Sequence, residues 1–516
     1  MPKKIFASIW SALCLSLLLL GLHVPGAAAK PAPRGQWSTV LAPNTNQLLY
    51  APINPIHAAL LSNGKVLIVA GSGNCPPSQT GCPTGAPYGP SNGSGAALYD
   101  PKFGSFTQFS LSWDMFCNSM VLLPDGRALI VGGTTQYDPF YGQPKTSIFD
   151  PSTTPNTFTN VQSMAQGRWY PTVTTLGDGR AMTFSGLDGS GNTTDLVEIY
   201  DPAGSGWTQV DCSSPGANCW TPPLYPRMHL LPNGKVFYSG PSAASYLFDP
   251  SIKAWSHVTN TNYSWRGYGT SVLLPLTPAN NYNPKVMIMG GNNPATATTE
   301  IIDLGAANPT WKYGPSMSQA RIEMNAVILP TGKVLALGGS KYDESVTSAS
   351  LKADLYDPAK NTFSSAGANA YARLYHSVAL LFPDATVWVA GGNPSRGSYE
   401  RRMEIYKPAY LFQPNGAPAI QPLISSAPSS ISWGSQFTVQ SPDAANISSV
   451  VLVRNGTVTH AFNTDQRLVG MSFTAGTGVL TITAPPNQNI APPGYYMFFL
   501  VNKTGVPSVA SSVRLH

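Results

Sequence analysis

One short pattern of apolar and polar positions recurs seven times along the chain, at intervals of roughly fifty residues. Each copy has an apolar run, a tight turn that mostly contains glycine, alternating apolar residues and one or two final glycines. Asp-Gly and Asn-Gly pairs are typical of hairpin turns, and the alternation gives each flanking strand one buried face. The copies are SNGKVLIVAG (ending at Gly71), PDGRALIVGG (Gly133), GDGRAMTFSG (Gly186), PNGKVFYSG (Gly240), NPKVMIMGG (Gly291), PTGKVLALGG (Gly339) and PDATVWVAGG (Gly392).

The spacing of these copies is the period of kelch repeats, in which each repeat forms one four-stranded blade. A single blade cannot bury both of its faces, so blades stack around an axis and protect their edges. The pattern therefore predicts an all-β fold with a seven-bladed kelch-type β-propeller over residues 30–410. The strand near Gln36 is expected to close the ring by joining the last blade. An aromatic-Asp-Pro turn separates most copies, at Tyr99, Phe149, Tyr200, Phe248 and Tyr356.

The repeat stops after Pro408, and the remaining chain has a different pattern. Several short alternating runs follow without a glycine pair, among them ISSVVLVRN, GVLTITAPP and GYYMFFLVN. Such runs predict a small antiparallel β-sandwich, immunoglobulin-like in outline, over residues 411–516.

The first 29 residues read as a secretory signal peptide. Lys3 and Lys4 precede an apolar run that ends near Leu20, and small residues follow up to Ala29. We expect cleavage after Ala29 and a secreted, extracellular or periplasmic protein with no membrane segment after cleavage; a retained N-terminal anchor is the alternative. The net charge of +6 is spread along the chain, and no basic cluster indicates nucleic-acid binding. Nothing in the sequence indicates the oligomeric state.

The six cysteines leave one without an obvious use. Cys14 lies in the signal peptide. Cys75 with Cys82, and Cys212 with Cys219, form two closely spaced pairs that predict local disulfides in an exported protein. Cys117 remains, and a free thiol in an oxidising compartment would be oxidised or cross-linked.

Three chemically active residues occupy the same position of the repeat. Cys117, Tyr170 and His376 each lie 16 residues before the last glycine of their copy, and Tyr375 precedes His376. Equivalent positions of a propeller are related by rotation about its axis, so these side chains are expected to meet at one end of the channel. Each residue alone is more often a packed side chain, and their shared position is what favours a site. His460, in the C-terminal domain, could reach the channel on a loop.

Two imidazoles and two phenol oxygens form a mixed nitrogen and oxygen donor set. Such a set suits a tetragonal Cu(II) site better than a tetrahedral sulfur site. A metal would also lower the pKa of a buried phenol, which otherwise titrates near 10 or above. Spacing alone leaves iron and zinc open.

At these residues the chain resembles the galactose oxidase and glyoxal oxidase family, the copper-radical oxidases. The likeness runs over about residues 50–516 and depends on long motifs that occur in the same order as in the family. The densest are WDMFCNSMVLLPDGRALIVGG, QGRWYPTVTTLGDGR, ARLYHSVALL, GTVTHAFNTDQR and PPGYYMFFLVNKTGVPSVASSVRL.

The resemblance implies a role for each of the five residues. Cys117 and Tyr170 match the pair joined by a thioether bond, and Tyr170 would be a copper ligand and the site of a protein radical. His376 and His460 match the imidazole ligands of one copper ion. Tyr375 matches the axial tyrosine, which takes the substrate's hydroxyl proton. The implied reaction oxidises a small-molecule alcohol or hydrated aldehyde with O2 and releases H2O2.

Departures from the family pattern bear on the substrate. Leu187 or Asp188 occupies the place of the tryptophan that covers the thioether in galactose oxidase; Trp265 is our candidate for that cover, and Arg266 for a substrate-binding arginine. The segment SKYDES, after Gly339, lacks the galactose-contacting phenylalanine. We therefore expect small aldehydes such as glyoxal, or simple primary alcohols.

Three other functions are alternatives to this oxidase activity. One is a galactose oxidase-type carbohydrate alcohol oxidase. Another is a non-catalytic kelch module that binds a glycan or protein. A hydrolase or lyase would need a carboxylate pair or a Ser-His-Asp set at the channel, and the sequence places neither there.

Overall fold

The computed structural model describes the chain except for residues 1–33, 75–94, 137–138, 205, 211–219 and 396. The predicted signal peptide and the two predicted disulfides, Cys75 with Cys82 and Cys212 with Cys219, lie outside the described residues. The described chain is all-β, as predicted, and its only helical segments are 3-10 turns. These turns are η1 (Gly71–Asn74), η2 (Pro278–Asn280), η3 (Val346–Ser348), η4 (Ala409–Leu411) and η5 (Ala444–Asn446). In the part of the chain that is described, no helix is long and apolar enough to cross a membrane.

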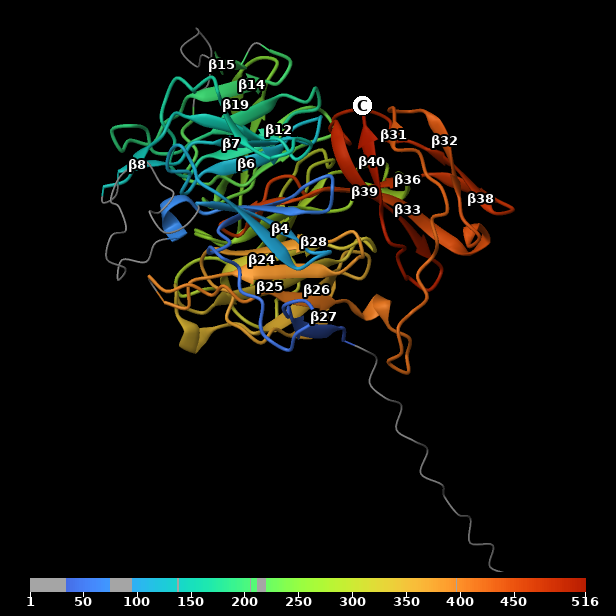
Figure 1. Ribbon diagram of the computed structural model, residues 1–516. Helices are drawn as coiled ribbons and strands as arrows, with labels where there is room; N and C mark the ends of the chain where they lie inside the picture. The colour runs from blue at the N-terminus through green and yellow to red at the C-terminus, as the bar shows by residue number, and fades with distance from the viewer. Residues whose placement is uncertain (1–33, 75–94, 137–138, 205, 211–219, 396) are drawn as a thin grey trace, which may run out of the picture.

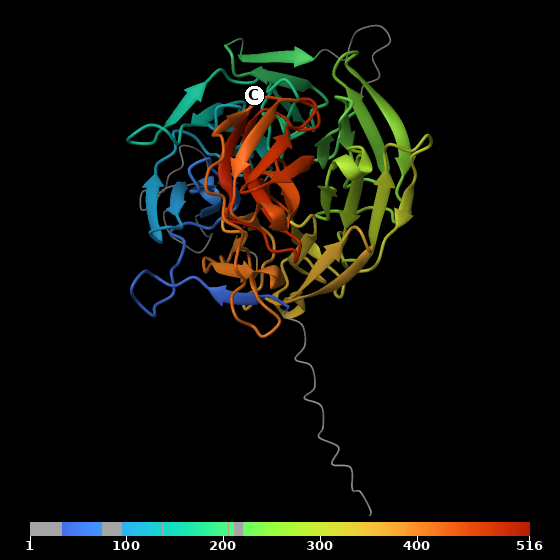
Figure 2. The ribbon, with the colours of Figure 1, turned by 90° about the vertical axis from the view of Figure 1, so that its right-hand side faces the viewer.

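Seven antiparallel sheets form a ring in the described residues, and Figure 2 shows this ring from its face. Each sheet contributes four strands to the ring, in order from the axis outward, and we call each set of four a blade; the sheet of blade 1 has two further strands, from a C-terminal hairpin, on the axis side of its first strand. Blade 1 contains β2 (His57–Leu60), β3 (Val66–Val69), β4 (Ala96–Asp100) and β5 (Ser105–Phe109); blade 2 contains β6 (Ser119–Leu122), β7 (Ala128–Val131), β10 (Thr146–Phe149) and β11 (Phe158–Val161); blade 3 contains β12 (Thr172–Thr175), β13 (Ala181–Phe184), β14 (Val197–Asp201) and β15 (Gly206–Val210).

The remaining blades continue in chain order. Blade 4 contains β16 (Met228–Leu230), β17 (Val236–Tyr238), β18 (Ala244–Asp249) and β19 (Ala254–Asn260); blade 5 contains β20 (Thr270–Leu273), β21 (Lys285–Met289), β22 (Thr299–Asp303) and β23 (Trp311–Tyr313); blade 6 contains β24 (Ile322–Ile328), β25 (Val334–Ser340), β26 (Lys352–Asp357) and β27 (Thr362–Ala368); blade 7 contains β28 (Ser377–Leu381), β29 (Val387–Gly391), β30 (Glu404–Lys407) and β1 (Gln36–Thr39). A short hairpin of β8 (Thr134–Gln136) and β9 (Tyr141–Gly142) projects from blade 2.

The ring closes where the sequence predicted that it would. β1 pairs antiparallel with β30, with Gln36 opposite Lys407, so the first described strand completes the last blade. The innermost strand of each blade is buried along its whole length, whereas outer strands such as β5 alternate between exposed and partly buried residues. The strands nearest the axis therefore form the core of the ring.

A β-sandwich follows the ring and covers one of its faces (Figures 1 and 2). One sheet contains β31 (Ser430–Ile431), β40 (Ser511–Leu515), β39 (Gly494–Asn502), β33 (Ile447–Arg454) and β36 (Leu468–Met471), and the other contains β32 (Gln436–Gln440), β38 (Val479–Thr483) and β37 (Phe473–Gly476).

The turns between the first and second strands of the blades face this sandwich. The side chain of Arg514 donates a hydrogen bond from Nε to the carbonyl oxygen of Pro124, at 3.0 Å, and Ser512 donates from Oγ to the carbonyl oxygen of Ser62, at 3.3 Å. The opposite ends of the innermost strands, where those strands begin, therefore lie on the face of the ring away from the sandwich.

One hairpin of the C-terminal region enters the ring. It consists of β34 (Thr457–Thr459) and β35 (Phe462–Asn463), and β34 pairs with β2 so that Thr459 lies opposite His57. Since His57 is at the beginning of its strand, the hairpin passes from the sandwich side to the far end of the channel. It carries His460 at its tip, as the sequence suggested.

A buried arginine–carboxylate pair recurs in four of the blades. Each arginine lies just before the innermost strand and each carboxylate lies on the third strand, with nitrogen–oxygen distances of 2.8–2.9 Å. A buried charge is costly without a partner, so each pair holds the start of its inner strand against the body of the blade. The pairs are Arg168–Glu198, Arg266–Glu300, Arg321–Asp354 and Arg373–Glu404.

Candidate metal centre

A set of residues in the left-handed backbone conformation surrounds the axis. Each lies at or just before the start of an innermost strand, and none is a glycine, although this conformation costs a non-glycine residue about 1–2 kcal/mol. The residues and their φ angles are Cys117 (61°), Tyr170 (64°), Tyr225 (46°), Tyr268 (50°), Glu323 (61°) and His376 (67°).

Backbone hydrogen bonds connect these residues from blade to blade. The amide of Tyr170 donates to the carbonyl oxygen of Cys117 at 3.1 Å, and the amide of Tyr225 donates to that of Tyr170 at 2.9 Å. The amide of Glu323 likewise donates to the carbonyl oxygen of Tyr268 at 2.9 Å. The left-handed turn thus lets neighbouring blades meet around the axis and directs their side chains into one space. We call these residues, with His376, the axial ring.

His460 reaches the axial ring from the C-terminal hairpin and is held on two sides. Arg227 donates from Nη2 to the carbonyl oxygen of His460 at 3.0 Å. The Nδ1 atom of His460 lies 2.6 Å from Oγ1 of Thr459, which in turn donates to the carbonyl oxygen of Ile56 at 3.3 Å. Because the threonine hydroxyl hydrogen is directed to that carbonyl, Nδ1 of His460 is the donor, and Nε2 keeps its lone pair for a metal.

The five predicted site residues converge. The ligand atoms of Cys117, His376 and His460 lie within 4.8 Å of one another, and all three side chains are buried. Nε2 of His460 is 3.9 Å from Sγ of Cys117, and the two imidazole rings are 4.8 Å apart at 85°. The hydroxyl groups of Tyr170 and Tyr375 are in contact with each other beside them.

The electrostatics of the imidazoles fit a metal site. Burial lowers the pKa of His376 to about 3 and lowers that of His460 well below its usual value, so both rings are neutral at neutral pH. Neither ring nitrogen of His376 has a well-formed hydrogen bond within the described residues, although the Asn393 amide lies nearby. Buried polar atoms normally have hydrogen-bond partners, so the ring nitrogens of His376 are the kind of group that a bound metal would satisfy. Two neutral imidazoles with two phenol oxygens are the donors that Cu(II) accepts.

Cys117 is a buried cysteine without a disulfide partner in the described chain. Burial, and to a smaller extent the carboxyl of Asp114, raises the pKa of its thiol well above the usual value. Without a metal the sulfur is therefore a protonated thiol rather than a thiolate, which disfavours nucleophilic catalysis. Its backbone is hydrogen-bonded to Tyr170, the residue to which the resemblance would join it.

The ring that covers Tyr170 is Trp169, and the prediction of Trp265 was wrong. The rings of Trp169 and Tyr170 stack with centroids 3.6 Å apart and planes at 8°, while Trp265 is 47% exposed. Phe140 stacks on the outer face of Trp169 at 4.3 Å, and Tyr225 packs against Tyr170 at 4.3 Å. The phenol of Tyr170 is thereby enclosed between aromatic rings.

Leu187, one of the two residues that the resemblance places where galactose oxidase has its covering tryptophan, supports Trp169 through the backbone. Leu187 and Trp169 exchange two backbone hydrogen bonds, of 2.8 and 2.9 Å. Neighbouring residues of a strand point to opposite faces, so a strand pattern gives no reason to stack Trp169 on Tyr170. The left-handed turn at Tyr170 breaks that alternation.

Arg266 does not face the site as a substrate-binding residue would. It is 4% exposed, and its Nη2 atom is 2.9 Å from Oε1 of Glu300. It belongs to the recurring arginine–carboxylate pairs of the blades. A count of arginines just before axial positions would have shown this, since Arg168 and Arg321 lie two residues before Tyr170 and Glu323, and Arg373 lies three before His376.

Two further buried polar residues at the axis were missed. The ring of His57 lies 5.5 Å from that of His460, and Nδ1 of His57 is 2.8 Å from the carbonyl oxygen of Val69. Glu323 belongs to the axial ring and, like Cys117, lies 16 residues before the last glycine of its repeat. The count that found Cys117 would therefore have found Glu323.

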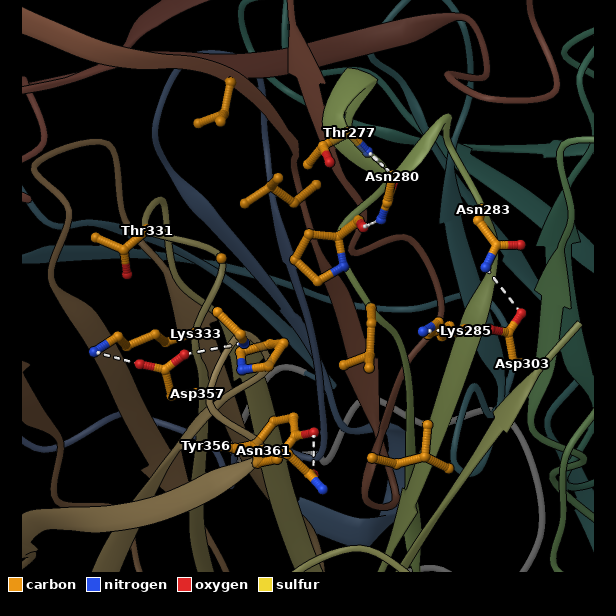
Figure 3. Close-up of a pocket in the computed structure, with 18 of the residues that line it drawn as sticks. Thr277, Asn280, Asn283, Lys285, Asp303, Thr331, Lys333, Tyr356, Asp357 and Asn361 are labelled. Carbon is orange, nitrogen blue, oxygen red and sulfur yellow. Dashed lines mark hydrogen bonds and ion pairs between the residues drawn. The ribbon is translucent and has the colours of Figure 1, made fainter. Parts of the chain in front are cut away.

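A separate cleft of about 840 Å³ lies between blades 5 and 6 and the C-terminal sandwich (Figure 3). None of the five site residues lines it. Four of the five charged groups that line it form ion pairs with one another: Lys285 with Asp303 and Lys333 with Asp357, both at 3.2 Å. The chemically active groups of this molecule are in the channel rather than in this cleft.

Known proteins support the fold and the family. A family model described as glyoxal oxidase N-terminus matches residues 92–410, and one described as galactose oxidase-like, early set domain, matches residues 421–515. A solved fungal alcohol oxidase, in complex with copper, has the same fold, with a TM-score of 0.78, 24% sequence identity and coverage of 94% of this chain and 100% of its own.

Two curated relatives cover most of the chain. Aldehyde oxidase GLOX from Vitis pseudoreticulata is 30% identical over 93% of this chain and 97% of its own length. Galactose oxidase from Gibberella zeae is 28% identical over 81% of this chain, which spans only 63% of that relative's length. With both domains matched in order, this chain belongs to the glyoxal oxidase family with a galactose oxidase-like early set domain.

Proposed function

We propose that this protein is a copper-radical oxidase that oxidises small hydrated aldehydes or primary alcohols with O2 and releases H2O2. The observation that carries the proposal is the convergence of Cys117, Tyr170, Tyr375, His376 and His460 at one buried point of the axial ring. His376, His460, Tyr170 and Tyr375 would hold one copper ion. Cys117 and Tyr170 would form the thioether-linked radical cofactor.

The chemistry needs two one-electron acceptors, because an alcohol loses two electrons and two protons when it becomes an aldehyde. Bound copper would supply one acceptor, and the enclosed ring of Tyr170 would supply the other. The phenol oxygen of Tyr375, in contact with that of Tyr170, would be a phenolate when copper is bound, and as a phenolate it would take the proton of the substrate hydroxyl. Tyr170 would take the hydrogen from the carbon. O2 receives the two hydrogens in total and leaves as H2O2, and a hydrated aldehyde becomes a carboxylic acid.

Trp169 and Phe140 support the radical role of Tyr170. Their rings stack outward from Tyr170 in order, so water has no direct approach to that face of the phenol. A ring that is one electron short is easily quenched, and a stacked, dry surrounding protects it.

The relative of matching length favours aldehydes. The Vitis protein is named an aldehyde oxidase and aligns over 97% of its length, whereas the galactose oxidase has a large part that this chain does not match. Carbohydrate alcohol oxidation of the galactose oxidase type is the second candidate.

The predicted export and domain limits fit this activity and remain predictions. We propose a signal peptide over residues 1–29, a propeller over 30–410, a sandwich over 411–516 and the disulfides Cys75–Cys82 and Cys212–Cys219. A secreted oxidase would act on extracellular substrates at ambient O2.

The test is to purify the protein without copper, add copper and air, and map its peptides by mass spectrometry. A Cys117–Tyr170 linked peptide, lighter by two hydrogens and resistant to thiol reductants, is the expected product. Peroxide release is then measured with glyoxal, methylglyoxal, short primary alcohols and galactose. A free Cys117 thiol and no peroxide from the copper-bound protein would instead support a non-catalytic kelch binding module.

A further inference from the structure

Glu323 lies in the axial ring next to the metal-binding residues. It shares the left-handed conformation of Cys117, Tyr170 and His376, and its amide bonds to the carbonyl oxygen of Tyr268. It belongs to blade 6, between Tyr268 of blade 5 and Tyr375 of blade 7. The rings of Tyr268 and Tyr375 contact each other edge to face at 5.4 Å.

The carboxyl group of Glu323 is buried, and the polar groups nearest to it are the carboxyl of Asp343 and the backbone of Glu344. The residue is 3% exposed, and neither carboxyl oxygen has a hydrogen bond of normal geometry within the described residues. It also forms no ion pair within the described residues, whereas the buried carboxylates on the third strands of blades 3, 5, 6 and 7 each pair with an arginine. Burial, with the nearby carboxyls of Asp343 and Glu344, raises the pKa of Glu323 well above its usual range. It is therefore a neutral acid that can both donate and accept a hydrogen bond.

The region between Glu323 and solvent is acidic. Asp343 is exposed and Glu344 is half-buried, and both lie on the loop after β25. The buried cation on the other side of Tyr268 is Arg227, whose three donor nitrogens are used on the carbonyl oxygens of Tyr225, Gly269 and His460.

The partial exposure of Tyr268 and Tyr375 indicates the side of the axial ring that is nearer to solvent. Tyr268 and Tyr375 are both half-buried, while Cys117, His376 and His460 are buried. Ser340, at the end of β25, pairs with Ile322, so the loop with Asp343 and Glu344 lies at the same end of blade 6 as Glu323, on the face of the ring where the inner strands begin.

We propose that the Glu323 carboxyl group binds a second oxygen of the substrate, and that Asp343 and Glu344 select neutral, hydroxyl-rich substrates over substrates that carry a carboxylate. This inference rests on the proposed oxidase activity. An aldehyde hydrate offers one hydroxyl to the metal side and a second to Glu323. A carboxylate-bearing aldehyde meets like charges at the entrance, which disfavour its binding.

The selection has a consequence for dialdehydes. Oxidation of one end of a dialdehyde produces an anionic aldehyde acid, which the same entrance disfavours as the next substrate. The enzyme would then release the monoacid, and a separate reaction that oxidises or condenses aldehyde acids would have to consume it.

The test compares glyoxal with glyoxylate, which are similar in size and differ in charge, using copper-loaded protein whose Cys117–Tyr170 link has been verified. We expect kcat/KM for glyoxal to exceed that for glyoxylate by at least tenfold, and added salt to narrow the gap. The double variant Asp343→Asn/Glu344→Gln should lower the ratio of kcat/KM for glyoxal to kcat/KM for glyoxylate at least fivefold. The control Asp125→Asn, in a turn on the sandwich side, should leave this ratio unchanged. If neither added salt nor the double variant changes the ratio of the two kcat/KM values, the proposed charge selection is wrong.

The hydrogen-bond role of Glu323 has its own variants. Glu323→Leu should raise KM for glyoxal about tenfold, the usual effect of losing one hydrogen bond, with kcat reduced less. Glu323→Gln, which keeps a donor and an acceptor, should restore most of the affinity, and Glu323→Met serves if the leucine variant does not fold. An unchanged KM in either apolar variant would overturn the role. If linked, copper-loaded wild type oxidises neither compound nor any alcohol, the oxidase proposal itself fails.

Discussion

Two positions of the same repeat, only two residues apart, behave in opposite ways. Arg168, Arg266, Arg321 and Arg373 occupy the first position in four of the blades and make the same kind of buried ion pair in each of the four. The second position holds Tyr170, Tyr268 and Glu323 and, one residue further from its arginine in blade 7, His376; these axial residues differ in chemistry. The constant position fixes the start of the inner strand, and this fixed backbone lets the neighbouring position vary without loss of the fold.

The largest expected effect is at the variable position. Tyr170→Phe removes the hydroxyl oxygen that would bind copper and carry the radical, so peroxide production should fall by more than about 10³-fold. Tyr313→Phe, at an exposed outer strand, is the matched control and should keep full activity. Activity is measured as peroxide released per bound copper. A phenylalanine variant that retains even a tenth of the activity would exclude Tyr170 as the radical site.

The constant position should affect stability instead. Arg321→Met leaves the Asp354 carboxylate buried without its partner, which should lower the free energy of unfolding by about 3–5 kcal/mol. Arg321→Met/Asp354→Leu should recover most of that loss, because no charge is left buried. Lys333→Met breaks the partly exposed pair with Asp357 and should cost at most about 1 kcal/mol. Urea unfolding measures all three; equal losses in Arg321→Met and Lys333→Met would contradict the framework role.

Much of the fold and of the candidate site could be predicted from the sequence, and the predictions that were wrong have physical causes. Periodicity identified the blades and the closure of the ring, because glycine turns and alternating apolar residues are local features. Counting from the glycines brought Cys117, Tyr170 and His376 together. Arg266 was misassigned because its partner, Glu300, lies 34 residues away on the third strand. Trp169 was missed because its direction depends on the left-handed turn at the next residue, which residue types do not show.

A smaller effect is expected at the hydroxyl that orients His460. Thr459→Val removes the acceptor of the Nδ1 hydrogen while it keeps the size and shape of the side chain. Loss of such a partner typically weakens metal affinity by about 10–100-fold. Copper affinity is measured by competition with a chelator, with Thr474→Val, on an exposed strand, as control. Unchanged affinity would mean that the Arg227 contact and the hairpin backbone alone position the imidazole.

The smallest effect should separate the two tryptophans. Trp169→Phe keeps a ring over Tyr170 but loses part of the stacking area, and a stacked aromatic pair contributes about 0.5–1.5 kcal/mol beyond its burial. The radical form should therefore decay about 2–10-fold faster after the oxidant is removed, which the loss of its electron paramagnetic resonance signal measures. Trp265→Phe, on the exposed loop before blade 5, should leave the decay unchanged. Faster decay in Trp265→Phe alone would restore Trp265 as the cover and show that the stack on Tyr170 has no part in protecting the radical.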